Sequence, residues 1–457
     1  MAANTFRCSV CGKRVKVQSQ IDVPIIDPNT GFTVCKNCIK DLYRIIEADE
    51  RQKLELSRKN FAWGLEGFLE KHKPHIIKEY LDEFIIKQER AKKILSVAAY
   101  NHYKRMKYDY FEKNGVNEEI DKSNVIIIGP TGCGKTAMIS HLSKLLDIPF
   151  AVTDASSLTE AGFVGADVEV AVRNLYYAAG QDIEKTEHGI IYLDEFDKIA
   201  RKSGENNSIT ADPGHEGVQQ GLLKMLEGSV VEFTARGQRK HPEAPTIKVD
   251  TKNILFIVGG AFVGIDKIVA KRIRKGEASL GFGVDVPAKE DDDEKFNELI
   301  HQVRPEDLMK YGIIPEIIGR LPIICTLETL DEHSLLRILT EPRNAPVKQY
   351  EKLLAMDNVK LEFEEGALLA VAKKAIERKT GARSLKGIIE DIMLDVMFEI
   401  PKSNEPRKVV VTEACVNDGA EPEIFPLDEN ERLSFEKVPS ENENDSSDGV
   451  SLEKNFS

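Results

Sequence analysis

Three short apolar runs in the chain have the length and composition of buried strands, being rich in Ile, Val and Leu and only four to eight residues long. They are Val125–Gly129, Ile190–Glu195 and Ile254–Gly260. Between the first two runs, apolar residues recur with the spacing of one helical face, at Val168, Val172, Leu175 and Ala179. From about residue 76 onward, strands and amphipathic helices therefore alternate, which predicts an α/β domain.

The pattern changes on either side of this domain. After about Leu321 it is mainly helical, with Val359–Phe363 and Lys408–Val411 as short strands, which predicts a second, smaller domain. Residues 6–48 have too few apolar positions for a core without a metal. The predicted organisation is a module over 6–48, a charged linker or partly helical connector over 49–75, domains over 76–320 and 321–425, and an acidic disordered tail over 426–457.

Composition narrows the classes of protein that the chain could belong to. It has 457 residues, of which 41% are hydrophobic, and no run of 18 uncharged apolar residues that would predict a membrane span. Met1–Arg7 is too short for a targeting peptide before the first cysteine pair, so we expect a cytoplasmic protein. The net charge of −13, without a long basic run, makes nucleic acid an improbable main partner.

The segment Gly129–Thr136 matches the phosphate-binding pattern G-x-x-x-x-G-K-[ST], after a predicted strand and before a predicted helix. Its glycines let backbone N–H groups close around phosphate oxygens, and the helix N-terminus adds positive potential. Lys135 would reach the outer phosphates, and the Thr136 hydroxyl would bind Mg²⁺. The alternative, a simple glycine-rich turn, fits the complete motif poorly. The predicted ATP-binding residues are Gly129, Pro130, Thr131, Gly132, Cys133, Gly134, Lys135 and Thr136.

Two carboxylates follow the second apolar run, 58 positions after Thr136. The apolar residues bury the strand and leave Asp194 and Glu195 at its carboxyl end, where open α/β sheets bind their ligands. Asp194 would orient Mg²⁺ through its water, and Glu195 would polarise an attacking water as a general base. An acidic strand end that caps the next helix would be the better interpretation if no phosphate loop preceded it.

Four of the seven cysteines form two Cys-x-x-Cys pairs near the N-terminus: Cys8 with Cys11, and Cys35 with Cys38. This spacing predicts a tetrahedral Zn²⁺ held by four thiolates, with no position open for water and hence a structural role. Four unrelated thiols are the alternative. The other cysteines are scattered, and a disulfide framework is not expected in a reducing compartment.

On these motifs, residues 76–425 resemble the ClpX family of AAA+ protein unfoldases nearly throughout. The resemblance implies an adenine pocket along Leu81–Lys93, with Ile85, Ile86 and Gln88 as contacts. It also implies that Arg320 reaches the nucleotide of a neighbouring subunit and that Arg383 is the sensor-2 arginine of the small domain. From spacing alone, the first segment would be a plain amphipathic helix start, and both arginines would be surface or salt-bridged residues.

The resemblance extends to segments that handle substrate and partner. Gly162, Phe163, Val164 and Gly165 match the pore loop Gly-Tyr-Val-Gly of that family, with Phe for Tyr, although a buried hairpin corner is an alternative. Residues 201–217 resemble its second pore loop, and Arg239, Lys240 and His241 resemble the basic collar of the pore, although such a triplet is ordinarily a solvated charge run. Leu280, Gly281 and Phe282 resemble the loop that docks onto the ClpP peptidase ring, usually Ile-Gly-Phe.

The fold class implied is therefore an α/β AAA+ P-loop ATPase large domain, a small mainly helical C-terminal domain and an N-terminal four-cysteine zinc module. The implied function is that of a homohexameric unfoldase using ATP, Mg²⁺ and Zn²⁺, which grips unfolded or tagged proteins and feeds them to a ClpP-type peptidase. Adaptor proteins would bind through the zinc module, and proteolysis would belong to the partner. Three alternatives are an HslU-type unfoldase, a peptidase-independent remodelling chaperone and a zinc-finger AAA+ DNA-binding protein.

Overall fold

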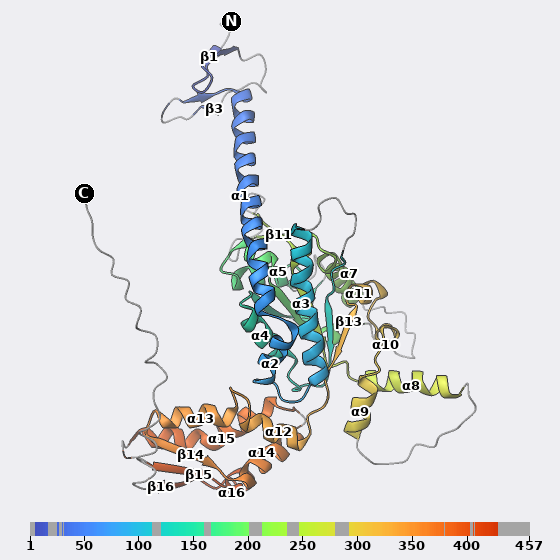
Figure 1. Cartoon of the computed structure of the whole chain (residues 1–457), viewed down its shortest axis with the longest axis vertical. Helices are drawn as coiled ribbons and strands as arrows, with labels where there is room; N and C mark the ends of the chain where they lie inside the picture. Colours follow the sequence, from blue (N-terminus) through green and yellow to red (C-terminus); the bar gives the residue numbers. More distant parts are fainter. Residues whose placement is uncertain are drawn as a thin grey trace. The chain divides into compact units, whose positions relative to one another are not determined.

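The computed structural model describes residues 5–16, 25–26, 30, 32–111, 120–159, 166–200, 213–234, 246–278, 292–378, 380–402, 405 and 407–427. The chain forms two compact units, each described here by itself. The first unit runs to His72 and includes Asn101–Asp121, and the second comprises Lys73–Tyr100 and the chain from Lys122 onward. Figure 1 shows the order of their elements along the chain.

The first unit consists of two small hairpins followed by one long helix. Strands β1 (Thr5–Arg7) and β2 (Arg14–Lys16) are antiparallel, as are β3 (Ile25–Ile26) and β4 (Thr33–Val34). Helix α1 (Lys36–Lys71) then runs for 36 residues without a break (Figure 1). The predicted module boundary at residue 48 falls inside this helix, and most of the segment expected as a linker or connector belongs to it.

Near its C-terminal end, α1 packs against the residues of α3 (Glu89–Phe111) that belong to the same unit. The rings of Phe68 and Tyr103 meet edge-on with centroids 5.0 Å apart, and Tyr103 is almost completely buried. Leu65 and Leu69, on the same turns of α1, are also buried. Among the described helices of the chain, none combines the length and apolar composition that crossing a membrane requires.

The second unit is organised around a five-stranded parallel sheet. The strand order is β13 (Ile323–Thr326), β5 (Val125–Ile128), β12 (Leu255–Gly260), β9 (Ile190–Asp194) and β6 (Phe150–Asp154). Every residue of β5 and β12 is buried, which explains their continuous apolar sequence, because helices cover both faces of a parallel sheet. The three strands predicted from the apolar runs are confirmed.

Helices and short strands surround this sheet. The predicted helical face lies on α5 (Val170–Ala178), where Val172 and Leu175 are fully buried. The other helices of this part are α2 (Pro74–Asp82), α4 (Lys135–Leu146), α6 (Ile183–Glu187), α7 (Pro213–Glu227), α8 (Ile265–Ala278), α9 (Asp292–Ile300), α10 (Pro305–Tyr311) and α11 (Pro315–Arg320). Two strand pairs, β7 (Leu158–Thr159) with β8 (Ala166–Asp167) and β10 (Val230–Thr234) with β11 (Thr246–Asp250), lie outside the main sheet.

From residue 327 onward the chain forms a smaller part with its own hydrophobic core. Its helices are α12 (Glu332–Thr340), α13 (Pro346–Ala355), α14 (Glu365–Glu377), α15 (Arg383–Glu399) and α16 (Glu413–Asn417). Strands β14 (Val359–Phe363) and β15 (Arg407–Val411) pair in parallel, and β16 (Glu423–Pro426) adds an antiparallel edge. The two strands predicted here are confirmed, and the third strand is an addition.

Candidate nucleotide site and cysteine cluster

The phosphate loop joins the end of β5 to the start of α4, as its motif predicts. Gly132 and Gly134 have φ angles of 78° and 100°, in the left-handed region that favours glycine. The Lys135 ammonium donates hydrogen bonds to the carbonyl oxygens of Gly129 and Pro130, at 2.7 and 2.8 Å. The loop thus holds its lysine against its own backbone, at the N-terminus of a helix whose N–H groups favour an anion.

The carboxylate of Asp194 meets this loop from the end of β9. The Thr136 hydroxyl donates to one carboxylate oxygen at 3.0 Å. The other oxygen accepts from the Tyr192 hydroxyl at 3.1 Å and from the Glu195 N–H at 2.9 Å. A hydroxyl and a carboxylate this close supply the oxygen ligands that Mg²⁺ prefers, and the donors fix the carboxylate in place.

Two glycines at the end of β12 make room for the side chains of this site. A Cβ atom on Gly259 would lie 2.1 Å from the Tyr192 hydroxyl, and one on Gly260 would lie 2.5 Å from the Asp197 carboxylate. Burial raises the pKa of Tyr192, so the phenol stays protonated and remains a donor to Asp194. The Asp197 carboxylate accepts from the Ala261 N–H at 3.2 Å and thereby joins the ends of β9 and β12.

Glu195 stands at the carboxyl end of β9 with an exposed side chain and a φ of 53°. A non-glycine residue in this region is unusual and is typical of functional sites, where surrounding structure holds a strained backbone. The conformation turns the chain sharply into a short 3₁₀ helix, Phe196–Ile199, and leaves the Glu195 carboxylate at the mouth of a cavity.

This cavity has a volume of about 440 Å³, within the size range of small-molecule sites. The phosphate loop, the ends of β9 and β12 and the start of α15 contribute to it. Its lining residues are Thr131, Gly132, Gly134, Lys135, Thr136, Ala137, Asp194, Glu195, Asp197, Lys198, Gly260, Ala261, Val263, Ala382 and Arg383. Most of the predicted phosphate and magnesium residues therefore come together, and Arg383 joins them from the smaller part of the chain.

The phosphate loop also contacts the smaller part of the chain backbone to backbone. The Ala382 N–H donates to the Gly132 carbonyl at 3.1 Å. A Cβ atom on Gly132 would lie 2.1 Å from the carbonyl oxygen of Thr380, so a larger residue would force the two loops apart. Gly381 faces this contact with a φ of 57°. The cavity is thus built by both parts of the chain.

Seven predicted residues are absent from the described lining of this cavity: Gly129, Pro130 and Cys133 of the phosphate loop, and Arg320, Ile85, Ile86 and Gln88. Arg320, at the end of α11, pairs with the Glu227 carboxylate at 2.8 Å and is about half exposed. Ile85 and Ile86 are buried between α2 and α3. Gln88 is 2% exposed, and its carboxamide is bonded to the backbone of Glu328. Their roles toward a nucleotide remain predictions.

Sequence reasoning missed part of the site. Asp197, Lys198, Gly260, Ala261 and Val263 all line the cavity. The signal for the last three was present, because the apolar run at Ile254 ends in two glycines and runs parallel to the strand that precedes the phosphate loop. Parallel neighbours bring their carboxyl ends to the same edge of the sheet.

The four N-terminal cysteines gather in one place, as predicted. Their sulfur atoms all lie within 4.8 Å of one another, and the Sγ atoms of Cys11 and Cys35 are 3.9 Å apart. Cys8 and Cys11 follow β1, while Cys35 precedes α1 and Cys38 lies in its first turn. Zinc–sulfur bonds of about 2.3 Å in a tetrahedron place sulfurs roughly 3.8 Å apart, so the cluster fits a four-thiolate metal ion.

The cysteines of the cluster alter one another's pKa. Backbone N–H groups of Cys11 and Cys35 donate to the Cys8 sulfur and lower its pKa to about 6. Hydrogen bonding to the sulfurs of Cys11 and Cys35 raises the pKa of Cys38 to about 12. One sulfur of the group thus ionises readily, whereas another holds its proton beside its neighbours. A cation bound at this spacing would stabilise all four sulfurs as thiolates.

Several predicted segments lie outside the described residues. They are the Gly162, Phe163, Val164 and Gly165 segment, most of the 201–217 segment, the Arg239, Lys240 and His241 triplet, the Leu280, Gly281 and Phe282 segment, and the acidic tail from residue 428. The first of these falls between β7 and β8, which pair in parallel. The segment at Leu280 falls between α8 and α9.

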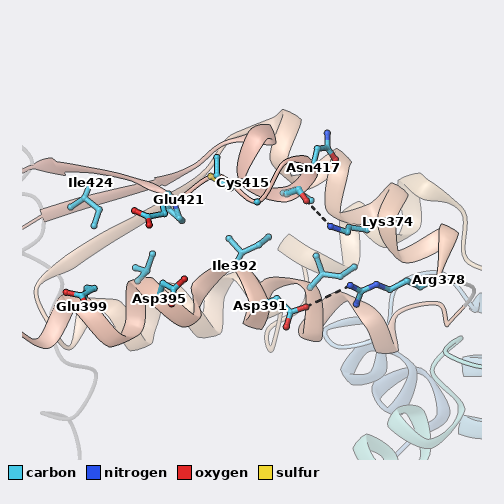
Figure 2. A pocket seen from close by; sticks show the side chains of 16 residues that line it. Lys374, Arg378, Asp391, Ile392, Asp395, Glu399, Cys415, Asn417, Glu421 and Ile424 are labelled. Carbon is cyan, nitrogen blue, oxygen red and sulfur yellow. Dashed lines mark hydrogen bonds and ion pairs between the residues drawn. The ribbon is translucent and has the colours of Figure 1, made fainter.

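A second cavity, of about 630 Å³, lies between α14, α15 and the α16–β16 turn. Figure 2 shows Asp391, Asp395 and Glu399 along α15, with Glu421 and Ile424 across from them. Two of its cationic side chains bond within its walls, since the Arg378 guanidinium lies 3.9 Å from Asp391 and the Lys374 ammonium donates to the Val416 carbonyl at 2.9 Å. It shares no lining residue with the first cavity, and of the two cavities only the first is lined by phosphate-loop residues.

Two family models match the chain, one over the part that contains the parallel sheet and one over the smaller part that follows it. Residues 120–324 match the AAA domain (Cdc48 subfamily), and this domain contains the phosphate loop, Asp194 and Glu195. Residues 330–411 match the C-terminal, D2-small domain, of ClpB protein. The first match makes the protein an AAA+ ATPase. With the second match, it is an AAA+ ATPase of the Clp/Hsp100 type, with a large α/β domain and a small, mainly helical C-terminal domain.

Proposed function

We propose that this ATPase is a protein unfoldase and translocase of the ClpX kind, which acts as a cytoplasmic homohexamer and passes substrates to a ClpP-type peptidase. The observation that carries the proposal is the shared cavity. Its phosphate loop is bonded to the loop before α15, and Arg383 from the small domain lines it. Chemistry on a bound phosphate would therefore act on both domains, which is what a motor requires.

The described residues divide the work of ATP hydrolysis among them. Lys135 binds the outer phosphates when it exchanges the loop carbonyls for phosphate oxygens. Thr136 and Asp194 would hold Mg²⁺, which would supply positive charge to the phosphates. Glu195 orients a water for attack and accepts its proton. Its side chain lines the cavity but is not one of the two proposed Mg²⁺ ligands, so its carboxylate is available as a base.

Two arginines complete the proposed site. Arg383 reaches the cavity from the first turn of α15 and would report the nucleotide state to the small domain. Arg320 projects from the end of α11, bound to Glu227, and would exchange this partner for the nucleotide of a neighbouring subunit. A guanidinium suits both tasks because it stays charged and pairs with phosphate oxygens in a planar fork.

Substrate grip is assigned to Phe163 and Val164. The two residues are apolar, stand between glycines and occur in the sequence between Thr159, where β7 ends, and Ala166, where β8 begins. We expect Phe163→Ala to leave ATP hydrolysis within about twofold of wild type and to lower the unfolding of a folded reporter by tenfold or more. Parallel ATPase and reporter assays measure the two effects.

The alternative for Phe163 is a place in the hydrophobic core. In that case the same change would destabilise the domain by about 3–5 kcal/mol, as truncation of a buried Phe does. A lowered melting temperature with normal unfolding per folded molecule would refute the assignment to substrate grip. Val230→Ala serves as the matched control, because Val230 is 58% exposed in the same domain and is absent from the lining of the cavity.

Peptidase docking is assigned to Leu280, Gly281 and Phe282. If Phe282 is an anchor at that interface, Phe282→Ala weakens binding to a ClpP ring by about 2 kcal/mol or more per site, as aromatic hot spots do. Several such segments engage one ring, so the loss multiplies through avidity. Titration with a ClpP ring measures the effect, and unchanged affinity would remove the case for a proteolytic partner.

The test of the whole proposal is degradation of a folded, tagged reporter by the purified protein, with and without a ClpP peptidase. We expect ATP-dependent loss of the reporter only when both proteins are present. Unfolding without degradation would instead identify a peptidase-independent remodelling chaperone. The cysteine module is proposed to bind zinc and to recruit adaptors and substrates, and its deletion would reduce degradation of adaptor-delivered substrates selectively.

A further inference from the structure

The two domains of the ATPase are joined by a short segment, Leu327–Asp331, between β13 and α12, which we call the connector. The segment Glu83–Gln88, between α2 and α3, lies against it. Its last two residues, Lys87 and Gln88, have φ angles of 60° and 63°. Two consecutive non-glycine residues adopt this left-handed conformation only where surrounding contacts hold them.

Gln88 supplies the strongest of these contacts. Its Nε2 atom donates to the Glu328 carbonyl at 2.9 Å, and its Oε1 atom accepts from the Glu328 N–H at 2.8 Å. The side chain thus forms hydrogen bonds with both the N–H and the carbonyl of one connector residue, as the backbone of a neighbouring strand would. Because Gln88 is 2% exposed, loss of this pair would leave buried polar groups without partners.

Lys87 adds a charged contact to the same segment. Its ammonium donates to the Thr329 carbonyl at 3.1 Å and lies 3.6 and 3.7 Å from the carboxylates of Glu328 and Asp331. On another side of the connector, His301 lies 2.9 Å from the Glu328 carboxylate. The connector is therefore held by α9 and its C-terminal turn on one side and by Lys87 and Gln88 on the other.

The Glu83–Gln88 segment is also tied to the phosphate-loop helix and to the small domain. The Phe84 ring stacks on His141 of α4, with centroids 4.1 Å apart and an interplanar angle of 18°. Burial lowers the pKa of His141, so this ring is neutral at neutral pH. At the start of the segment, the Glu83 carbonyl accepts from the Arg343 N–H at 2.9 Å.

A buried lysine fixes the middle of the segment. Lys92 is 2% exposed, donates to the Ile85 carbonyl at 3.2 Å and pairs with Glu89 at 2.7 Å and with Asp82. These contacts make Glu83–Gln88 a braced unit rather than a free loop. A displacement of α4 would therefore be transmitted along the segment to Lys87 and Gln88.

We propose that Lys87 and Gln88 are positioning residues that clasp the connector and couple the phosphate-loop helix to the angle between the two domains. In this role Gln88 faces the Glu328 backbone and leaves base recognition to other residues. Only one expected effect, a change in the ATP consumed per substrate unfolded, rests on the proposed unfoldase function. The clasp itself is a property of the nucleotide-free protein and can be tested there.

The test compares wild type with Gln88→Met, which nearly preserves volume and removes both hydrogen bonds. In the full-length protein without nucleotide, we expect amide exchange across Leu327–Asp331 to accelerate about fivefold or more, the effect of losing one net hydrogen bond. ATP consumed per reporter unfolded should rise severalfold, while the preference for ATP over GTP in kcat/KM stays within twofold. Val97→Ala, which alters an exposed residue of the same helix, is the matched control.

Each outcome decides the proposal. If Gln88→Met loses the preference for ATP and amide exchange in the connector is unchanged, Gln88 is a base contact and the clasp is overturned. Wild-type behaviour of Gln88→Met in every measurement would also overturn the clasp. If Gln88→Met does not fold, Lys87→Met decides instead, because Lys87 is only half-buried and its removal should also accelerate connector exchange. If wild type unfolds no reporter, the proposed function fails, whereas the exchange measurement still tests the clasp.

Discussion

The Glu195→Gln protein is expected to bind ATP normally and to hydrolyse it about 10²–10⁴ times more slowly, the usual cost of losing a positioned general base. The amide keeps the size and shape of the side chain but cannot accept the proton of an attacking water. Binding should persist because the contacts of Lys135, Thr136 and Asp194 do not involve the Glu195 carboxylate. Equilibrium nucleotide binding and steady-state phosphate release measure the two effects.

The control for this experiment is Glu306→Gln, which alters an exposed glutamate in the first turn of α10 in the same domain. It should retain wild-type turnover. Turnover of Glu195→Gln within twofold of wild type would exclude Glu195 as the base. Loss of nucleotide binding together with turnover would instead show that the left-handed backbone at Glu195 had been disturbed, since that φ of 53° is part of how the site is built.

Removal of zinc should have a comparably large effect on a different part of the chain. We expect about one zinc per chain, and we expect chelation to unfold the segment that contains Cys8, Cys11, Cys35 and Cys38. The described core of this segment consists of Cys8, Cys35 and Cys38 with Phe6 and Val34 packed against them, which is too small to persist alone. Binding to a structural four-ligand site contributes roughly 10–16 kcal/mol in small zinc modules, so folding and binding are coupled.

Metal analysis and amide exchange on the full-length protein test this prediction. After chelation, exchange should accelerate across residues 5–40 and remain unchanged in β5, β9 and β12 of the ATPase sheet. Cys38→Ser should reproduce the effect without a chelator, because three thiolates bind the ion less well. Cys415→Ser, which changes a buried cysteine of the small domain, should keep its zinc. A protein that contains no zinc and shows no change on chelation would contradict the assignment.

The sequence alone determined those features whose chemistry is local. The phosphate loop could be found because its complete motif lies within eight consecutive residues. The apolar pattern on either side places the motif between a strand and a helix. Asp194 and Glu195 followed from the rule that strand ends meet at one edge of a parallel sheet. The cysteine pairs were recognisable because metal geometry requires their spacing.

Helix α1 marks a limit of the apolar pattern. Residues 49–71 were expected as a charged linker or partly helical connector, but they continue a single helix from Lys36. Their sequence is rich in Glu, Lys, Arg and Leu, all of which favour helix, yet apolar residues at helical spacing occur only near its end, at Phe61, Leu65, Phe68 and Leu69. Periodicity detects helices that bury a face, so a helix that stays largely polar escapes it.

Only the tertiary structure decided which distant residues meet. Gln88 binds a residue 240 positions away, and Gly132 lies against Gly381 with space for no side chain between them. Spacing along a sequence contains no information about such contacts, because they depend on how two domains pack after each has folded. The sequence therefore predicted the groups that we propose to bind phosphate, whereas the structure showed that the small domain completes their cavity and that Lys87 and Gln88 contact the segment joining the two domains.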